Sequence, residues 1–240
     1  MPTVILARHG RTTANATGIL AGRSKGIHLD ETGREQATAA AARLEGLPLA
    51  AVVTSPMERC RETARLLARD TRVASDRRLT ECDYGSWTGR PLKELGKEPL
   101  WRVVQAHPSA AVFPDGEGLA GMQARAVAAV RHHDARIAAA HGPRAVWLAC
   151  SHGDVIKSIL ADALASHLDN FQRIVVDPCS ISVVVYTETR PFVVRVNDLG
   201  GDVAGLVPPE PEPGEENAQQ SSEAVVGGSA GRGDEIAVPR

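Results

Sequence analysis

Two spacings of apolar residues alternate along this chain. Short aliphatic runs are typical of strands buried on both faces, and longer Ala-rich stretches repeat apolar residues at helical spacing. The sequence predicts strands at Thr3–Arg8, Ala51–Ser55 and Ala145–Ser151. It predicts helices at Thr32–Glu45, from Pro56 to about Arg69, at Gly118–Ala140 and at Asp154–Leu164.

Two of the predicted helices carry start signals. Thr32 and Glu35 have the spacing of a capping box, in which each side chain binds a free backbone N–H of the first turn. Pro56 is expected in the first turn of its helix, where a missing N–H costs nothing.

The last two predicted strands, Ser180–Thr187 and Phe192–Asn197, are separated only by a turn around Thr189–Pro191. They predict a hairpin, and therefore at least one antiparallel pairing. The preceding alternation of strands and helices predicts an α/β fold, a three-layer αβα sandwich whose mostly parallel sheet has helices on both faces. Ligands in such sheets bind beyond the carboxyl ends of the strands, where Arg8, Ser55 and Ser151 are expected to converge.

The composition changes near Val207. Residues 207–240 are rich in Pro, Gly and Ser, and contain seven acidic and two basic residues. This composition predicts a disordered tail that is dispensable for folding and turnover. We therefore expect one domain at residues 1–206 and a tail at 207–240.

Composition narrows the function classes. The 240 residues carry a formal net charge of −2, which disfavours nucleic acid as a partner. No apolar run is long enough to span a membrane, and the N-terminus lacks the basic region of a signal peptide. The four cysteines match no zinc motif, so we expect them to be reduced and the protein to be cytoplasmic.

Two clusters follow the first two predicted strands. The first, Arg8-His9-Gly10-Arg11-Thr12-Thr13-Ala14-Asn15, combines a nucleophile with guanidinium, hydroxyl and amide groups. Guanidinium groups bind phosphate oxygens in pairs, and an imidazole nitrogen can attack phosphorus. The second cluster begins at Ser55 and places Arg59 in the first turn of a helix, close to the same sheet edge.

Two further clusters complete the candidate site. Leu79–Gly89 holds Glu81 and Asp83 in an aperiodic stretch, where partial burial would raise a carboxyl pKa for proton donation. Ser151-His152-Gly153-Asp154 lies between a strand and a helix, so a helix N-terminus faces any bound anion.

Two other chemistries fit the residue types less well. A serine hydrolase would need a G-x-S-x-G elbow, which is absent around Ser151. A metal could be held by His9, His152 and Glu81, but H-E-x-x-H is absent and the neighbouring arginines would repel a cation.

The four clusters resemble, in order, the motifs of the histidine phosphatase superfamily, which includes the cofactor-dependent phosphoglycerate mutases. The motifs are Arg8-His9-Gly10-x-Thr12-x-x-Asn15, the S-P-x-x-R run from Ser55, the L-x-E run from Leu79 and Ser151-His152-Gly153-Asp154. The resemblance spans roughly residues 3–197.

The resemblance implies roles. His9 would be the phosphorylated nucleophile, oriented by the Gly10 carbonyl, and Glu81 the general acid and base. Arg8, Arg59 and His152 would bind the transferring phosphoryl group. Further substrate contacts are expected from Gly10, Asn15, Ala21, Gly22, Arg23, Tyr84 and Gly153, with no metal and no cofactor. Trp87, Arg90, Trp101, Arg102 and Phe113 are candidates for the pocket wall, although each is equally compatible with core or surface.

The resemblance leaves open a choice between hydrolysis and mutase-type transfer. Where the mutases have F-T-G-W, this chain has Leu20-Ala21-Gly22-Arg23, and Trp101-Arg102 is followed by Val103 instead of a second arginine. Both departures favour a phosphatase acting on a small phosphorylated metabolite, with Arg23 replacing part of the lost anion contact. A catalytically inactive phosphate-binding regulatory module is the remaining alternative function. A homodimer is the assembly that the sequence leaves open.

Overall fold

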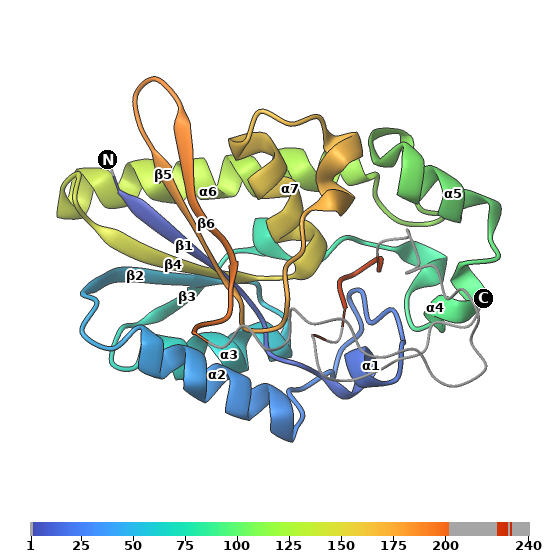
Figure 1. Cartoon of the computed structure of the whole chain (residues 1–240), viewed down its shortest axis with the longest axis horizontal. Coiled ribbons are helices and arrows are strands. Elements are labelled where there is room, and N and C mark those ends of the chain that lie inside the picture. The colour runs from blue at the N-terminus through green and yellow to red at the C-terminus, as the bar shows by residue number, and fades with distance from the viewer. Residues whose placement is uncertain (1, 202–224, 230, 232–240) are drawn as a thin grey trace.

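The computed structural model describes residues 2–201, 225–229 and 231, and in it a six-stranded sheet lies between two layers of helices (Figure 1). The strand order is β3-β2-β4-β1-β5-β6. This is the predicted three-layer α/β architecture.

Four strands form a parallel block and two form an antiparallel extension. The parallel strands are β1 (Thr3–Arg8), β2 (Leu49–Thr54), β3 (Val73–Ser75) and β4 (Val146–Ser151). β5 (Ile181–Tyr186) and β6 (Pro191–Asp198) form the predicted hairpin, and β5 pairs antiparallel with β1. The carboxyl ends of β1, β2 and β4 therefore meet at one edge of the sheet.

The long helices cover the two faces of the sheet. α2 (Glu31–Arg43) and α3 (Glu58–Ala68) pack on one face, and α6 (Leu119–His141) and α7 (Gly153–Ala163) on the other (Figure 1). Shorter helices lie beyond the carboxyl edge: α1 (Thr13–Ala16), α4 (Leu92–Leu95) and α5 (Pro99–Ala106). Single 3₁₀ turns occur at Arg77–Leu79, Gly85–Trp87, Pro108–Ala110 and Leu168–Arg173.

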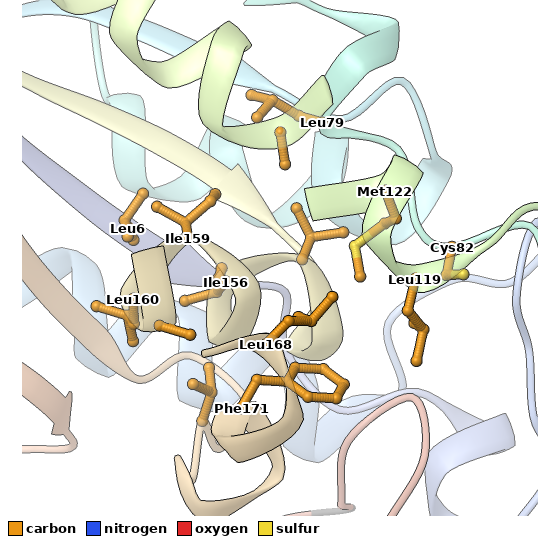
Figure 2. Packing of buried hydrophobic residues seen from close by; sticks show 14 of the residues in the cluster. Leu6, Leu79, Cys82, Leu119, Met122, Ile156, Ile159, Leu160, Leu168 and Phe171 are labelled. Carbon is orange, nitrogen blue, oxygen red and sulfur yellow. The ribbon is translucent and has the colours of Figure 1, made fainter. Parts of the chain in front are cut away.

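The alternation of side chains along β1 divides the core into two clusters. Val4 and Leu6 pack against α6 and α7, whereas Ile5 and Ala7 pack against α2 and α3. Figure 2 shows the first cluster, in which side chains of α7 lie between Leu6 and the ring of Phe171. The sheet is buried on both faces, which explains why its central strands have continuous apolar sequences.

Several local predictions need correction. α2 is capped by Asp30, whose carboxylate accepts a hydrogen bond from Gly33 N at 2.7 Å. Thr32 instead accepts a hydrogen bond from Arg11, so the Thr32–Glu35 capping box was wrong. Pro56 precedes α3 and Pro191 begins β6. Both differences arise because tertiary contacts extend or shorten an element beyond its local signal.

Besides the 3₁₀ turns, four elements had no counterpart in the prediction: α1, β3, α4 and α5. β3 has only three residues, two of them exposed, so it lacks an apolar run. Among the described residues, no helix is both long and apolar enough to cross a membrane. Most of the predicted tail lies outside the described residues, except 225–229 and 231.

Candidate active site

His9 follows the last residue of β1 and lies almost completely buried at the carboxyl edge of the sheet. Its Nδ1 is 2.7 Å from the carbonyl oxygen of Gly10, which can only accept a hydrogen bond. The proton of a neutral ring is therefore on Nδ1, and the lone pair is on Nε2. Burial, followed by the Arg59 and Arg8 charges, lowers the pKa of His9 well below 6.5. The ring is neutral at physiological pH, as a nucleophile requires.

Two buried guanidinium groups flank this ring. Arg59, in the first turn of α3, donates from Nε to His9 Nε2 at 3.3 Å and from Nη2 to the Gly22 carbonyl at 2.8 Å. Arg8 donates from Nη1 to the Val176 carbonyl at 2.8 Å and from Nη2 to the Ser229 carbonyl at 2.7 Å. Within the described part of the chain, Arg8 Nε and Arg59 Nη1 are buried without a hydrogen-bond partner.

Such unpaired donors are costly to bury, and an anion bound there would satisfy them. A phosphoryl group offers the acceptor oxygens that these two N–H groups lack. The structure thus brings Arg8, His9 and Arg59 together as the sequence predicted.

His152, directly after β4, packs its ring edge-on against His9, with a centroid separation of 5.3 Å. Arg59 Nη2 is 3.1 Å from its Nδ1, which must accept because a guanidinium has no acceptor. Its Nε2 therefore donates to Ser55 Oγ at 2.8 Å.

Glu81 is the carboxyl group of this site. Its Oε1 accepts a hydrogen bond from Cys82 N at 2.9 Å, and its Oε2 is 3.8 Å from His152 Nδ1. Burial, reinforced by the nearby Asp154 carboxylate, raises the pKa of Glu81 to about 7. Burial, followed by the Arg59 charge, lowers the pKa of His152 well below 6.5. His152 is therefore neutral, so its contact with Glu81 is not an ion pair, and near neutral pH Glu81 can act both as an acid and as a base.

The backbone of Glu81 is held by two arginines. Arg23 Nε and Arg125 Nη2 both donate to its carbonyl oxygen, at 2.9 and 3.1 Å. Arg23 also pairs with Asp83 and Glu117. Arg23 is thus engaged in holding the loop of Glu81, and its contact with a substrate anion stays a prediction.

A cavity of about 350 Å³ opens beside His9, Arg59 and Glu81. The predicted residues Asn15, Ala21 and Gly22 line it. The amide oxygen of Asn15 accepts hydrogen bonds from Thr12 N and Oγ1, which fixes α1 at the cavity. Unpredicted lining residues are mainly apolar and come from the α1 and α4 regions: Thr12, Ala14, Thr17, Gly18, Ile19, Leu20, Pro91, Leu92 and Lys93.

Some predicted residues do not reach the cavity. Tyr84 is fully buried, and its hydroxyl donates to Asp154 Oδ2 at 2.8 Å, so its assignment to substrate binding was wrong. Gly10 and Gly153 have no side chain, so their roles in the structure depend on the backbone. A Cβ at Gly10 would overlap the Gly33 carbonyl, and Gly153 begins α7.

The suggested aromatic wall belongs to the core instead. Trp87 stacks on Trp101 with a centroid separation of 6.2 Å and packs edge-on against Phe113. Arg90 pairs with Glu98, and Arg102 is exposed. In the described regions, no group of three or more His, Cys, Asp or Glu side chains is arranged to hold a metal ion.

The C-terminal residues Val225–Ser229 and Gly231 also line the cavity. No motif marked them, because their composition resembles the rest of the tail. The packing of Val225–Ser229 against the cavity differs from the expected disorder of the whole tail, because Val226 is buried in the core. The domain boundary at 206 stays a prediction, and residues 202–224, 230 and 232–240 are outside the described residues.

The fold and site define an α/β protein with a buried, neutral histidine beside two buried arginines at the carboxyl edge of its sheet. A family model of the histidine phosphatase superfamily (branch 1) matches residues 4–199, and the chain belongs to this family. It is 30% identical over 212 residues to the probable phosphoglycerate mutase GpmB of Yersinia enterocolitica, covering 86% of this chain and 95% of that protein.

Solved structures agree with the family assignment. Bacillus stearothermophilus YhfR superposes with a TM-score of 0.74 at 28% identity, covering 82% of this chain and 98% of that one. A mycobacterial glucosyl-3-phosphoglycerate phosphatase, at 24% identity, also has a TM-score of 0.74 over 82% of this chain and 99% of its own, which supports the fold alone.

Proposed function

We propose that this protein hydrolyses small phosphomonoesters through a phosphohistidine intermediate on His9, and that the reaction requires no metal ion. The observation that carries the proposal is the state of His9. Its Nδ1–H is fixed on the Gly10 carbonyl, its Nε2 lone pair accepts only a long hydrogen bond of 3.3 Å from Arg59 Nε, and the buried guanidinium groups of Arg8 and Arg59 each keep an N–H without a partner.

In the first step, His9 Nε2 forms a bond to phosphorus while the bond from phosphorus to the leaving oxygen breaks. Arg8 Nε and Arg59 Nη1 bind the equatorial oxygens and stabilise their charge. Glu81, whose pKa is about 7, transfers its proton to the leaving oxygen. The products are phosphohistidine, a Glu81 carboxylate and a free alcohol.

In the second step, the Glu81 carboxylate accepts a proton from water, and the water oxygen attacks phosphorus. The bond from phosphorus to His9 breaks, and inorganic phosphate leaves. Glu81 is again protonated and His9 neutral. The same groups therefore serve both steps, with Glu81 alternating between acid and base.

Rapid quench with a radiolabelled phosphomonoester tests this proposal. We expect label on the protein that is labile to acid and stable to base, and we expect none on a His9→Ala variant. A His9→Ala variant that retains more than a few per cent of the wild-type rate would contradict the mechanism.

Mutase-type transfer between hydroxyls of a phosphoglycerate is the second candidate, favoured by the similarity to GpmB proteins. A mutase substrate has a carboxylate in addition to its phosphate. Among the described residues that line the cavity, the cationic side chains are Arg59 and the exposed Lys93. This sparse positive charge favours hydrolysis, and a mutase assay with 3-phosphoglycerate beside the phosphatase assay separates the two.

A further inference from the structure

A short segment from the end of the chain, Val225–Ser229, lies against the catalytic cavity. Figure 1 shows it in red near α1 and α4, whose residues line the same cavity. Val226 is buried in the cluster that contains Leu20 and Tyr84. A tight turn, closed by Gly228 N donating to the Val225 carbonyl at 3.1 Å, reverses the backbone here.

Three hydrogen bonds join this segment to buried charged groups of the domain. Gly227 N donates to Asp154 Oδ2 at 3.0 Å. The Ser229 carbonyl accepts from Arg8 Nη2 at 2.7 Å, and the Ser229 hydroxyl donates to Asp177 Oδ1 at 3.2 Å. Hydrogen bonds to charged groups are the stronger class, so the contact is more than apolar packing.

The two glycines fit this position for steric reasons. Both have a left-handed backbone, with φ of 77° at Gly227 and 84° at Gly228. A Cβ at Gly227 would lie 2.8 Å from Leu20 Cδ1, and a Cβ at Gly228 would lie 2.8 Å from Arg8 Cζ. No other residue allows the backbone to approach the guanidinium so closely.

We propose that Val225–Ser229 is the closing wall of the substrate pocket and a specificity-determining segment, which holds Arg8 and selects phosphomonoesters with an apolar leaving group. This inference rests on the proposed function. The segment is a wall and not a plug, because a cavity of about 350 Å³ stays open beside it. His9, Arg59 and Glu81 still face the cavity beside it.

The selectivity follows from the two sides of the cavity. Val225 and Val226 provide one apolar side, and Ile19, Leu20 and Leu92 provide the other. Burial of an apolar leaving group between these two sides makes the free energy of binding more favourable. A second charged group would instead lose its hydration without finding a buried partner.

Ligand binding tests the wall without depending on turnover. Isothermal titration calorimetry would compare benzylphosphonate, which fills both halves of the site, with inorganic phosphate, which fills only the phosphoryl half. The full chain is compared with a chain that ends at Gly201. We expect the shorter chain to bind benzylphosphonate at least about fivefold more weakly, with a smaller loss for phosphate.

A full-length variant guards against misfolding of the shorter chain. Gly228→Ala should weaken benzylphosphonate binding in the same way, because the new Cβ meets Arg8. Gly46→Ala is the matched control, since Gly46 has a similar φ of 81° and nothing within 4 Å of a new Cβ. We expect less than a twofold change there.

The results distinguish a failure of the proposed pocket wall from a failure of the proposed phosphatase function. Unchanged benzylphosphonate affinity in both altered proteins would overturn the wall, and tighter binding would show that the segment competes with ligand. If the full chain binds neither probe, the phosphate site itself is refuted, and the proposed function fails with this inference.

Discussion

Replacing Glu81 by Gln separates its chemical role from its cost in stability. Glutamine has nearly the same shape and keeps an oxygen that can accept the hydrogen bond from Cys82 N. It cannot ionise and it cannot donate a proton to a leaving group. The substitution therefore removes the titration and the acid while leaving the packing of this buried site unchanged.

The stability effect follows from the pKa. The pKa of Glu81 is raised from 4.5 to about 7 in the folded protein. This difference of about 2.5 units corresponds to about 3 kcal/mol at about 1.4 kcal/mol per unit. A raised pKa means that the contribution to stability is complete below pH 4.5 and is lost as the pH rises to about 7.

Urea unfolding at about pH 4 and about pH 8 measures this loss. Between these values, the free energy of unfolding of the wild type should fall by about 3 kcal/mol more than that of Glu81→Gln. Titrating groups that do not interact with Glu81 are the same in both proteins and cancel in the difference. Parallel pH dependence of the two proteins would refute the raised pKa.

The kinetic effect should depend on the leaving group. An alkoxide leaves poorly, so loss of the acid should slow the phosphorylation step of an alkyl phosphate about 10²–10⁴-fold. p-Nitrophenol leaves readily and should be slowed much less. Single-turnover rates are required, because the variant also lacks the base that activates water in the second step.

Asp83→Asn is the matched control for this experiment. Asp83 is two residues from Glu81, but its carboxylate pairs with Arg23, and its side chain is 38% exposed. If Glu81→Gln slows both substrates equally and Asp83→Asn reproduces the selective effect, the acid has been assigned to the wrong carboxyl group.

Three other predictions concern charge, metal and backbone. Asp154→Asn should lower the pKa of Glu81 and move the alkaline limb of the pH profile of kcat/KM to lower pH; an unmoved limb would show that Asp154 does not act on the acid. Dialysis against EDTA should leave the rate unchanged, and activity restored by zinc or magnesium would favour a metallohydrolase. Gly121→Ala, on the exposed face of α6 with no atom near a new Cβ, should raise the free energy of unfolding by about 0.5–1 kcal/mol, measured in urea. Gly10→Ala should instead destabilise the protein, because its Cβ overlaps the Gly33 carbonyl; equal stability of both variants would contradict that packing.

The strands and helices around the site could be predicted because their signals are local. β1 and β4 have continuous apolar runs, and polar residues follow each run directly. Parallel strands then place those polar residues at one edge. The convergence of His9, Arg59 and His152 thus needs only the order of elements and the direction of the sheet.

The use of each polar group could not be predicted in the same way. Arg23 and Tyr84 have the residue types of a phosphate site, but their partners are far along the chain. Arg23 is 94 residues from Glu117, and Tyr84 is 70 residues from Asp154. Whether a side chain is free for substrate depends on which distant groups the fold brings beside it.

The sequence by itself predicted the family, the long helices and central strands, and the polar residues that converge at the carboxyl edge of the sheet, since each of these is encoded within a few neighbouring positions. The tertiary structure alone decided the shape and polarity of the pocket. Residues 225–229 look like the rest of an acidic, Gly-rich tail, and only three-dimensional contact places Val226 in the core and Ser229 on Arg8. The physical reason is that burial and hydrogen-bond pairing are properties of neighbours in space, whereas apolar periodicity is a property of neighbours along the chain.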